Sequence, residues 1–160
     1  MLVDYRQVAA RAEKIIADQG ILRPPVDPEQ IAAQVGLEVV YAEFPDELRE
    51  IVSGYIEPEH KRIVVNRDTS GARQIFTIAH ELGHYILHRA YTESPDYRIM
   101  LRRNTYADEK PEEEREADAF AAHLLVPDAM LKRYRDIATV RELARAFGVS
   151  EDVIRNRLNH

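Results

Sequence analysis

Residues 76–88 read Phe-Thr-Ile-Ala-His-Glu-Leu-Gly-His-Tyr-Ile-Leu-His, and the rest of the chain is interpreted around this stretch. His80, Glu81 and His84 form an H-E-x-x-H motif within it. Residues four apart lie one turn apart on the same face of a helix, so both imidazoles can approach a single metal ion. Glu81 follows the first histidine closely enough to reach a water on that metal and serve as general base. The motif therefore predicts the chemistry of zinc hydrolysis.

The flanking residues favour a helix over a chance match to three fixed positions. Apolar residues recur at three- and four-residue steps beside the histidines, as expected of an amphipathic helix. These residues are Ile75, Ile78, Ala79, Leu82 and Ile86. Ser70 is a suitable N-cap, and the predicted helix runs to about Arg89. Gly83 inside it costs about 1 kcal/mol relative to alanine, which indicates that another element approaches closely there.

The composition is that of a globular protein. The 160 residues, 45% of them hydrophobic and 31% charged, favour one domain with a buried core. The 22 basic and 28 acidic side chains give a net charge of −6, which disfavours a nucleic-acid clamp. The absence of cysteine excludes disulfides, cysteine-ligated zinc and thiol catalysis, and suits a reducing cytosol. No apolar run approaches the roughly 20 residues of a membrane span, and the amino terminus lacks a signal-peptide profile. We therefore expect a cytoplasmic protein with no membrane contact.

The chain before the motif combines helical and strand patterns. Asp27 is a predicted N-cap with Pro28 at the first helical position, and Gly20 and Gly36 are helix stops. The predicted elements are helices at residues 4–19 and 30–35 and strands at 37–41, 52–56 and 62–66. A hairpin-length loop joins the last two strands, so we expect a small, mostly antiparallel sheet packed against the helices. His60 at the hairpin tip is assigned no chemical role.

Residues 112–127 supply the second half of the predicted site. Pro111 and the acidic residues after it mark a strong helix start, and the helix carries a buried face of small and apolar residues. Glu114 and Asp118 lie one turn apart on one face, beside positions that permit close approach of another helix. A glutamate there would complete a His₂Glu set, and an aspartate would accept the outer ring N–H of a ligating histidine. Glu113 and Glu116 remain alternatives to Glu114, because this choice rests on spacing alone.

The segment between the two halves shows no clear period. His88 continues the histidine stripe, but it lies about 12 Å along the helix from His80 and is not expected to share the metal ion. Residues 90–111 are predicted to form a long loop, in which aromatic and basic side chains either line a substrate groove or are simply solvated. These side chains are Tyr91, Tyr97, Arg102, Arg103 and Tyr106. The solvated interpretation is favoured for each of them taken singly.

The pairing of residues 76–88 with residues 114–127 resembles the ImmA/IrrE family of metallopeptidases, and the likeness extends over most of the chain. The predicted fold is α+β, with a helical, zincin-like core. The resemblance implies a zinc endopeptidase that cleaves a helix-turn-helix repressor, so that mobile-element or stress-response genes are expressed. Carried over by position, His80 and His84 would bind one Zn²⁺ with Glu114, and Glu81 would be the general base. Asp118 stands where the family often has asparagine, in keeping with a supporting role outside the ligand set. His123 and Val126 stand where glutamate and methionine are frequent.

The carboxy-terminal residues raise an alternative function. Thr139 and Glu142 form a predicted capping box, Gly148 ends that helix, and Ser150 begins another that runs to Leu158. Such a pair has the outline of a helix-turn-helix, and a DNA-binding or repressor-binding module, or a metal-bound module without hydrolysis, is the competing interpretation. Acidic residues at the start of the second helix argue against direct DNA binding.

The predicted organisation is a single metallopeptidase domain spanning residues 1–160. Its parts are amino-terminal helices at 1–36, the small sheet at 37–66, the metal-site helices at 70–127 and the helical pair at 139–158.

Overall fold

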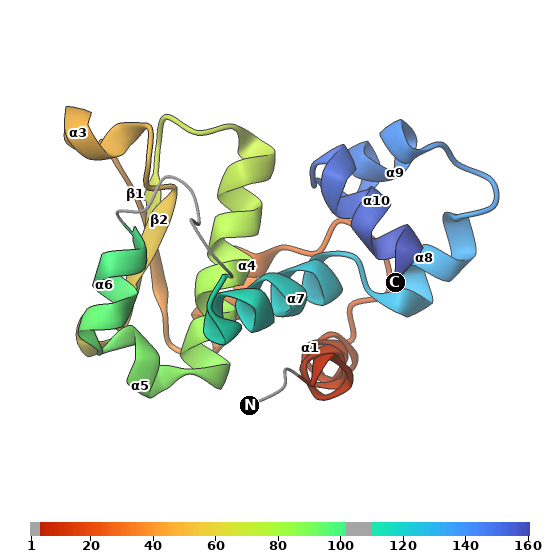
Figure 1. The fold of residues 1–160 in the computed structure, drawn as a ribbon. Helices are drawn as coiled ribbons and strands as arrows, with labels where there is room; N and C mark the ends of the chain where they lie inside the picture. Colours follow the sequence, from red (N-terminus) through yellow and green to blue (C-terminus); the bar gives the residue numbers. More distant parts are fainter. Residues whose placement is uncertain (1–3, 102–109) are drawn as a thin grey trace.

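The computed structural model describes residues 4–101 and 110–160, and it confirms an α+β fold that is mostly helical (Figure 1). The helices are α1 (Tyr5–Asp18), α2 (Pro28–Gln34), α3 (Asp46–Arg49), α4 (Gly71–Leu87), α5 (Arg89–Thr92), α6 (Pro95–Leu101), α7 (Glu112–Leu125), α8 (Asp128–Tyr134), α9 (Val140–Phe147) and α10 (Glu151–Asn159). The strands are β1 (Glu38–Ala42), β2 (Gly54–Glu57) and β3 (Arg62–Asn66), with a 3₁₀ turn at Pro58–His60. Within the described ranges, none of the helices combines the length and the apolar character needed to cross a bilayer.

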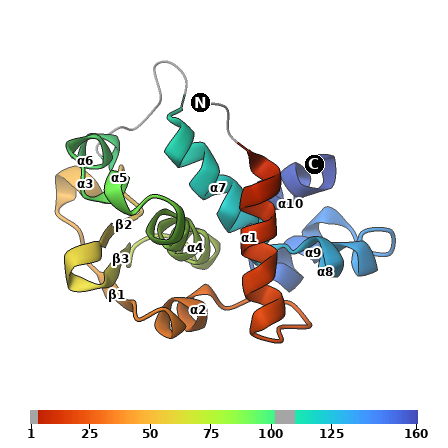
Figure 2. The ribbon, with the colours of Figure 1, turned by 90° about the horizontal axis from the view of Figure 1, so that it is seen from below.

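Helix α4 lies at the centre of the molecule, between the sheet and α7 (Figures 1 and 2). Its start is the one predicted from sequence, since the Ser70 hydroxyl accepts a hydrogen bond from the amide of Arg73 at 3.2 Å. The close approach expected at Gly83 is present. A Cβ added to Gly83 would lie 2.9 Å from Cδ1 and 3.2 Å from Cβ of Phe120, a fully buried side chain of α7. The missing side chain therefore lets α4 and α7 cross closely enough for their polar residues to meet.

The sheet is mixed, which differs from the mostly antiparallel sheet expected. The strand order is β1-β3-β2, with β2 antiparallel and β1 parallel to β3. The central place falls to β3 because Ile63, Val64 and Val65 are all buried, whereas β1 has exposed positions. Since β2 and β3 form a hairpin, a first strand that pairs with β3 instead of β2 must run parallel to it.

The amino-terminal helices brace the central pair. Asp4 caps α1 through the amides of Arg6 and Gln7, and α1 packs along α7, as Figure 2 shows. Val8, Ala12 and Ile16 of α1 are buried and belong to the same hydrophobic cluster as the apolar residues of α4 and α7. Asp27 caps α2 as predicted, by accepting from the amide of Glu29 at 3.0 Å.

The segment after α4 corrects the sequence interpretation. In place of a long loop from residue 90, the chain forms the short helices α5 and α6, and α6 begins at Pro95. Helices of four to seven residues are too short to show a periodic pattern. The same reason explains why α3 and α8 were not predicted.

The carboxy-terminal pair has the boundaries expected of it. The capping box between Thr139 and Glu142 is formed, and Gly148 ends α9 with φ of 71°. Ser150 then caps α10 by accepting from the amide of Val153. Together with α8, this pair lies on the opposite side of α4 from the sheet (Figure 1).

Candidate metal centre

Three side chains from α4 and α7 converge where the helices cross. One nitrogen each of His80 and His84 and one carboxylate oxygen of Glu114 all lie within 4.8 Å of one another. His80 Nε2 is 3.1 Å from Glu114 Oε1, and His84 Nε2 is 3.0 Å from Glu114 Oε2. The predicted spacing along α4 and the crossing of α7 thus bring together two imidazoles and one carboxylate.

This donor set fits a metal ion. Two neutral imidazole nitrogens and one carboxylate oxygen are the ligands of many hydrolytic zinc sites. His84 is fully buried, and its Nε2 makes no hydrogen bond to any residue in the described part of the chain, although it faces Glu114. A buried ring nitrogen without a hydrogen bond is costly unless something else binds it, and a metal ion would do so.

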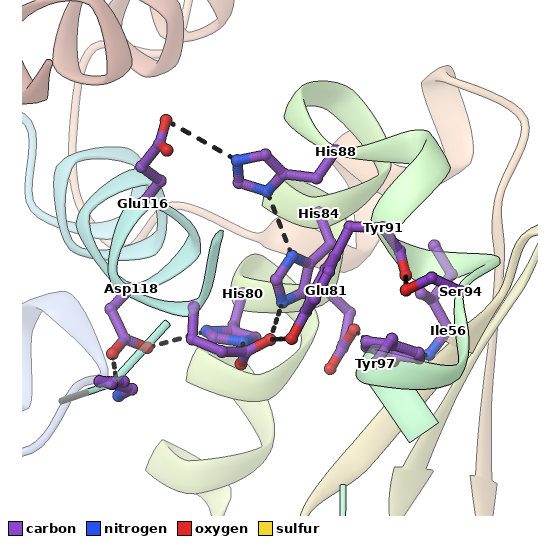
Figure 3. Close-up of polar contacts among 12 residues, drawn as sticks. Ile56, His80, Glu81, His84, His88, Tyr91, Ser94, Tyr97, Glu116 and Asp118 are labelled. Carbon is purple, nitrogen blue, oxygen red and sulfur yellow. Dashed lines mark hydrogen bonds and ion pairs between the residues drawn. The ribbon is translucent and has the colours of Figure 1, made fainter. Parts of the chain in front are cut away.

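His80 has an outer partner on α7. Its Nδ1 lies 2.9 Å from Asp118 Oδ1, and the other Asp118 oxygen contacts Lys110 Nζ (Figure 3). Burial opposes a charged ring, but the hydrogen bonds to Asp118 and Glu114 outweigh it and raise the pKa of His80 to about 10. Burial also opposes ionisation of Glu114, yet the two histidine rings close to its carboxylate hold its pKa well below the ordinary value. The metal-free centre is therefore an ionised carboxylate beside a protonated ring.

Glu81 is held from the side of the sheet. It is 4% exposed, and its Oε2 accepts a 2.8 Å hydrogen bond from the Tyr97 hydroxyl. That hydroxyl in turn accepts from the amide of Ile56 in β2 at 2.7 Å. Tyr97 and Ile56 lie next to each other in Figure 3. Burial raises the pKa of Glu81 to about 7, and the His80 charge and the Tyr97 bond only partly oppose this. A carboxylate in this state can both accept and return a proton near neutral pH.

Two tyrosines of the α5–α6 segment contact this centre, although sequence reasoning favoured solvated side chains. The Tyr91 hydroxyl donates to Glu114 Oε2 at 2.8 Å, and Tyr97, at 3% exposed, is buried against Glu81. The spacing did contain a signal for the first of these. Residue 91 follows His84 by seven positions and His88 by three, so a helix that continued would carry it on the histidine face. Arg102, Arg103 and Tyr106 lie outside the described residues.

The structure also separates the alternatives on α7. Glu116 Oε2 lies 3.7 Å from His88 Nε2 and not among the converging atoms, and Glu113 is about 100° around the helix from Glu114. The side chain of His123 lies with Glu13 and Asp128 instead of with the α4 histidines. Of the glutamates considered, Glu114 is the one whose carboxylate meets both imidazoles.

Comparison with known proteins agrees with this arrangement. The peptidase M78 family, described as the IrrE N-terminal-like domain, matches residues 32–159. The chain belongs to this family. The expected ImmA/IrrE membership is therefore confirmed, and with it a metallopeptidase relationship. A curated relative is the uncharacterized immunity region protein 2 of Bacillus phage phi105, which is 30% identical over 131 residues that cover 79% of this chain and 76% of the phage protein.

A solved structure shares the fold of this IrrE-like chain. A Mycobacterium tuberculosis transcriptional regulator superposes with a TM-score of 0.67 at 18% identity, over 96% of this chain and 46% of the regulator. At that identity the likeness shows the fold alone. The chain spans less than half of the length of the regulator.

Proposed function

We propose that this chain is a zinc-dependent endopeptidase that cleaves a helix-turn-helix transcriptional repressor and thereby allows expression of mobile-element or stress-response genes. The observation that carries the proposal is the convergence of His80, His84 and Glu114 beside the buried carboxylate of Glu81. Membership of the IrrE-like peptidase family supports the reaction class. The relative named as a phage immunity region protein supports a role in the regulation of an immunity repressor.

In this proposal His80, His84 and Glu114 hold one zinc ion. When bound, zinc supplies a Lewis acid that lowers the pKa of a water molecule and polarises the scissile carbonyl group. Asp118 fixes the ring of His80 through Nδ1, and Tyr91 fixes the carboxylate of Glu114. Both contacts restrict the ligands to one orientation before the substrate arrives.

Glu81 carries the proton in this reaction. Its Oε2 is bound by the Tyr97 hydroxyl, which leaves Oε1 to take a proton from the attacking water and to deliver it to the leaving amine. A pKa raised to about 7 by burial suits both halves of that transfer. Tyr97 is itself fixed by the amide of Ile56, so the general base is positioned from the edge of the sheet.

A groove beside the centre is large enough for a polypeptide segment. It has a volume of about 1000 Å³ and is lined by His80, Glu81 and Glu114 together with residues of α1, α7 and α10 and those at the start of β2. Its lining includes Ser53 and Gly54 beside β2 and Asn156 of α10. An extended substrate can therefore contact both the sheet and the carboxy-terminal helices while its peptide bond is at the centre.

The contacts of α10 favour a protein partner over DNA. Arg155 forms ion pairs with Glu151 and Asp152 at the start of the helix, and Arg157 is buried against Val126 and Asp128. Basic side chains that are engaged in this way are poorly placed to bind phosphates. We accordingly propose one metallopeptidase domain in which α10 of the helical pair contributes to the substrate groove.

The test compares Glu81→Gln with wild type, and the zinc content of each is measured on the purified protein. Each is expressed in the source organism, and new protein amino termini are mapped by mass spectrometry. We expect wild type to create a cleavage within a helix-turn-helix repressor and the variant to lose at least about 100-fold of that rate while it keeps its zinc. Equal cleavage by both, or zinc-loaded wild type that cleaves no repressor, would contradict the proposal.

A further inference from the structure

The side chain of His88 contacts His84 of the candidate centre at Nδ1, the ring nitrogen that does not face Glu114. His88 is the residue that follows α4, and its Nδ1 lies 3.3 Å from Nδ1 of His84 (Figure 3). The ring centroids are 5.5 Å apart, and the His88 side chain is 11% exposed. The spacing along the helix excluded His88 as a ligand, but it placed the ring within reach of the outer nitrogen of His84.

The tautomer of His84 follows from its two contacts. This step rests on the proposed zinc site, in which Nε2 of His84 is the ligand because it faces Glu114. A ligating nitrogen carries no proton, so the neutral ring must carry its proton on Nδ1. That N–H is fully buried and needs an acceptor. In the described part of the chain the acceptor within reach is His88 Nδ1.

We propose that His88 is a positioning residue for the metal ligand His84. Its Nδ1 accepts the hydrogen bond from His84 Nδ1–H, which fixes the tautomer and the ring plane of the ligand. The His88 proton must then reside on Nε2, which points toward Glu116 Oε2 at 3.7 Å. The chain of contacts therefore runs from His84 through His88 to Glu116.

The other ligand has a parallel arrangement. His80 Nδ1 contacts the Asp118 carboxylate, which in turn contacts Lys110. Each imidazole of the centre thus has a partner at Nδ1, which is Asp118 for His80 and His88 for His84. Each of these partners lies next to a further charged side chain. The two partners differ in chemistry, since His80 is paired with a carboxylate and His84 with a neutral imidazole. Outer partners of ligating histidines orient the ring and set its basicity.

A purely structural role for the His88 side chain is the competing explanation. His88 does help to end α4, because its amide donates to the carbonyl of His84 at 2.7 Å. That contact uses the backbone alone, so it survives replacement of the side chain. The positioning role can therefore be separated from the helix end by comparing two substitutions of the same side-chain shape, of which only one keeps an acceptor.

The experiment compares His88→Leu with His88→Asn, two side chains of similar size. Asparagine places an oxygen where His88 has Nδ1 and can accept the same hydrogen bond, whereas leucine cannot. Zinc affinity is measured by competition with a chromophoric chelator. We expect His88→Leu to weaken zinc binding by about 10- to 100-fold and His88→Asn to keep most of the wild-type affinity. Glu116→Gln should weaken zinc binding less than His88→Leu does, because Glu116 acts on His84 only through His88.

A spectroscopic measurement separates positioning from general loss of packing. In zinc-loaded wild type and His88→Asn, a long-range ¹H–¹⁵N spectrum should show His84 protonated on Nδ1, with the proton protected from exchange with water. In His88→Leu the proton should exchange rapidly. If His88→Leu bound zinc as tightly as wild type, or if His88→Asn bound it as weakly as His88→Leu, the positioning role would be overturned. Wild type that binds no zinc would instead overturn the zinc centre itself.

Discussion

Helix α7 carries two clusters of histidine and carboxylate side chains, one near each end. Near its start, Glu114 meets His80 and His84 of α4. Near its end, His123 meets Glu13 of α1 and Asp128 of α8, and there too one ligand atom from each residue lies within 4.8 Å of the others. By residue type and distance alone, the two clusters are equally able to bind a metal ion.

The two clusters differ in the groups that lie next to their carboxylates. At the second cluster, Arg157 is 3% exposed, forms an ion pair with Asp128 and donates to the carbonyl of Val126 at 3.1 Å. Burial and the nearby Arg157 charge both lower the pKa of His123. At the first cluster, the Glu114 carboxylate is contacted by two imidazoles and the Tyr91 hydroxyl. The second cluster holds a permanent guanidinium charge, whereas the positive charge of the first is a proton on His80 that a metal ion would displace.

The largest expected effect is on metal content. Glu114→Ala should lose the single zinc ion that we expect wild type to retain after dialysis, because it removes the charged ligand. Asp128→Ala should retain that ion, since the second cluster is balanced by Arg157. Elemental analysis of both variants beside wild type is the measurement. Zinc that is lost from Asp128→Ala and kept by Glu114→Ala would reverse the assignment of the two clusters.

A smaller effect is expected on the stability of the protein when the buried guanidinium group of Arg157 is removed. Arg157→Met should lower the free energy of unfolding by roughly 1.5–3 kcal/mol, because hydrogen bonds to a buried charged group are lost. Arg155→Met on the same helix is the control. Its side chain is 55% exposed, so loss of its ion pairs should cost no more than about 1 kcal/mol. Denaturant unfolding of the zinc-free proteins measures both, and equal losses would mean that Arg157 has no special role at the second cluster.

The smallest predicted effect, per unit of pH, is the pH dependence of zinc binding. The pKa of His80 is raised to about 10, so below that pH the zinc-free ring is protonated and must release a proton to bind. His84 and Glu114 have lowered pKa values and release none near neutrality. Affinity should therefore rise with pH, by about tenfold or 1.4 kcal/mol for each unit between about pH 6 and pH 8.

The control for this pH dependence is Asp118→Asn, which weakens one of the two hydrogen bonds that raise the pKa of His80. Its slope should flatten toward the upper end of the range. Binding at the second cluster would release no comparable proton, because the pKa of His123 is lowered. A wild-type affinity that does not change with pH would contradict the protonation state assigned to His80.

Local periodicity explains which of these features could be predicted. His80 and His84 had to share a face of α4, and Glu114 and Asp118 a face of α7, because the positions are four apart on helices. Gly83 indicated the close approach of another helix, and Phe120 makes it. The sequence interpretation was wrong where contacts join distant segments through short elements. Tyr97 is 16 residues from Glu81 and 41 from Ile56, yet its hydroxyl contacts both.

The sequence by itself determined the α+β class, the two site helices, the capped carboxy-terminal pair and the family, since these depend on patterns within a few turns of helix and on a pair of motifs. Only the tertiary structure decided that Glu114 and not Glu116 meets both imidazoles, that β1 runs parallel to β3, and that Arg157 occupies the second cluster. The physical reason is that a helix fixes the angles between its own side chains. What each face meets is set by how the elements pack, and that depends on the burial of the whole core.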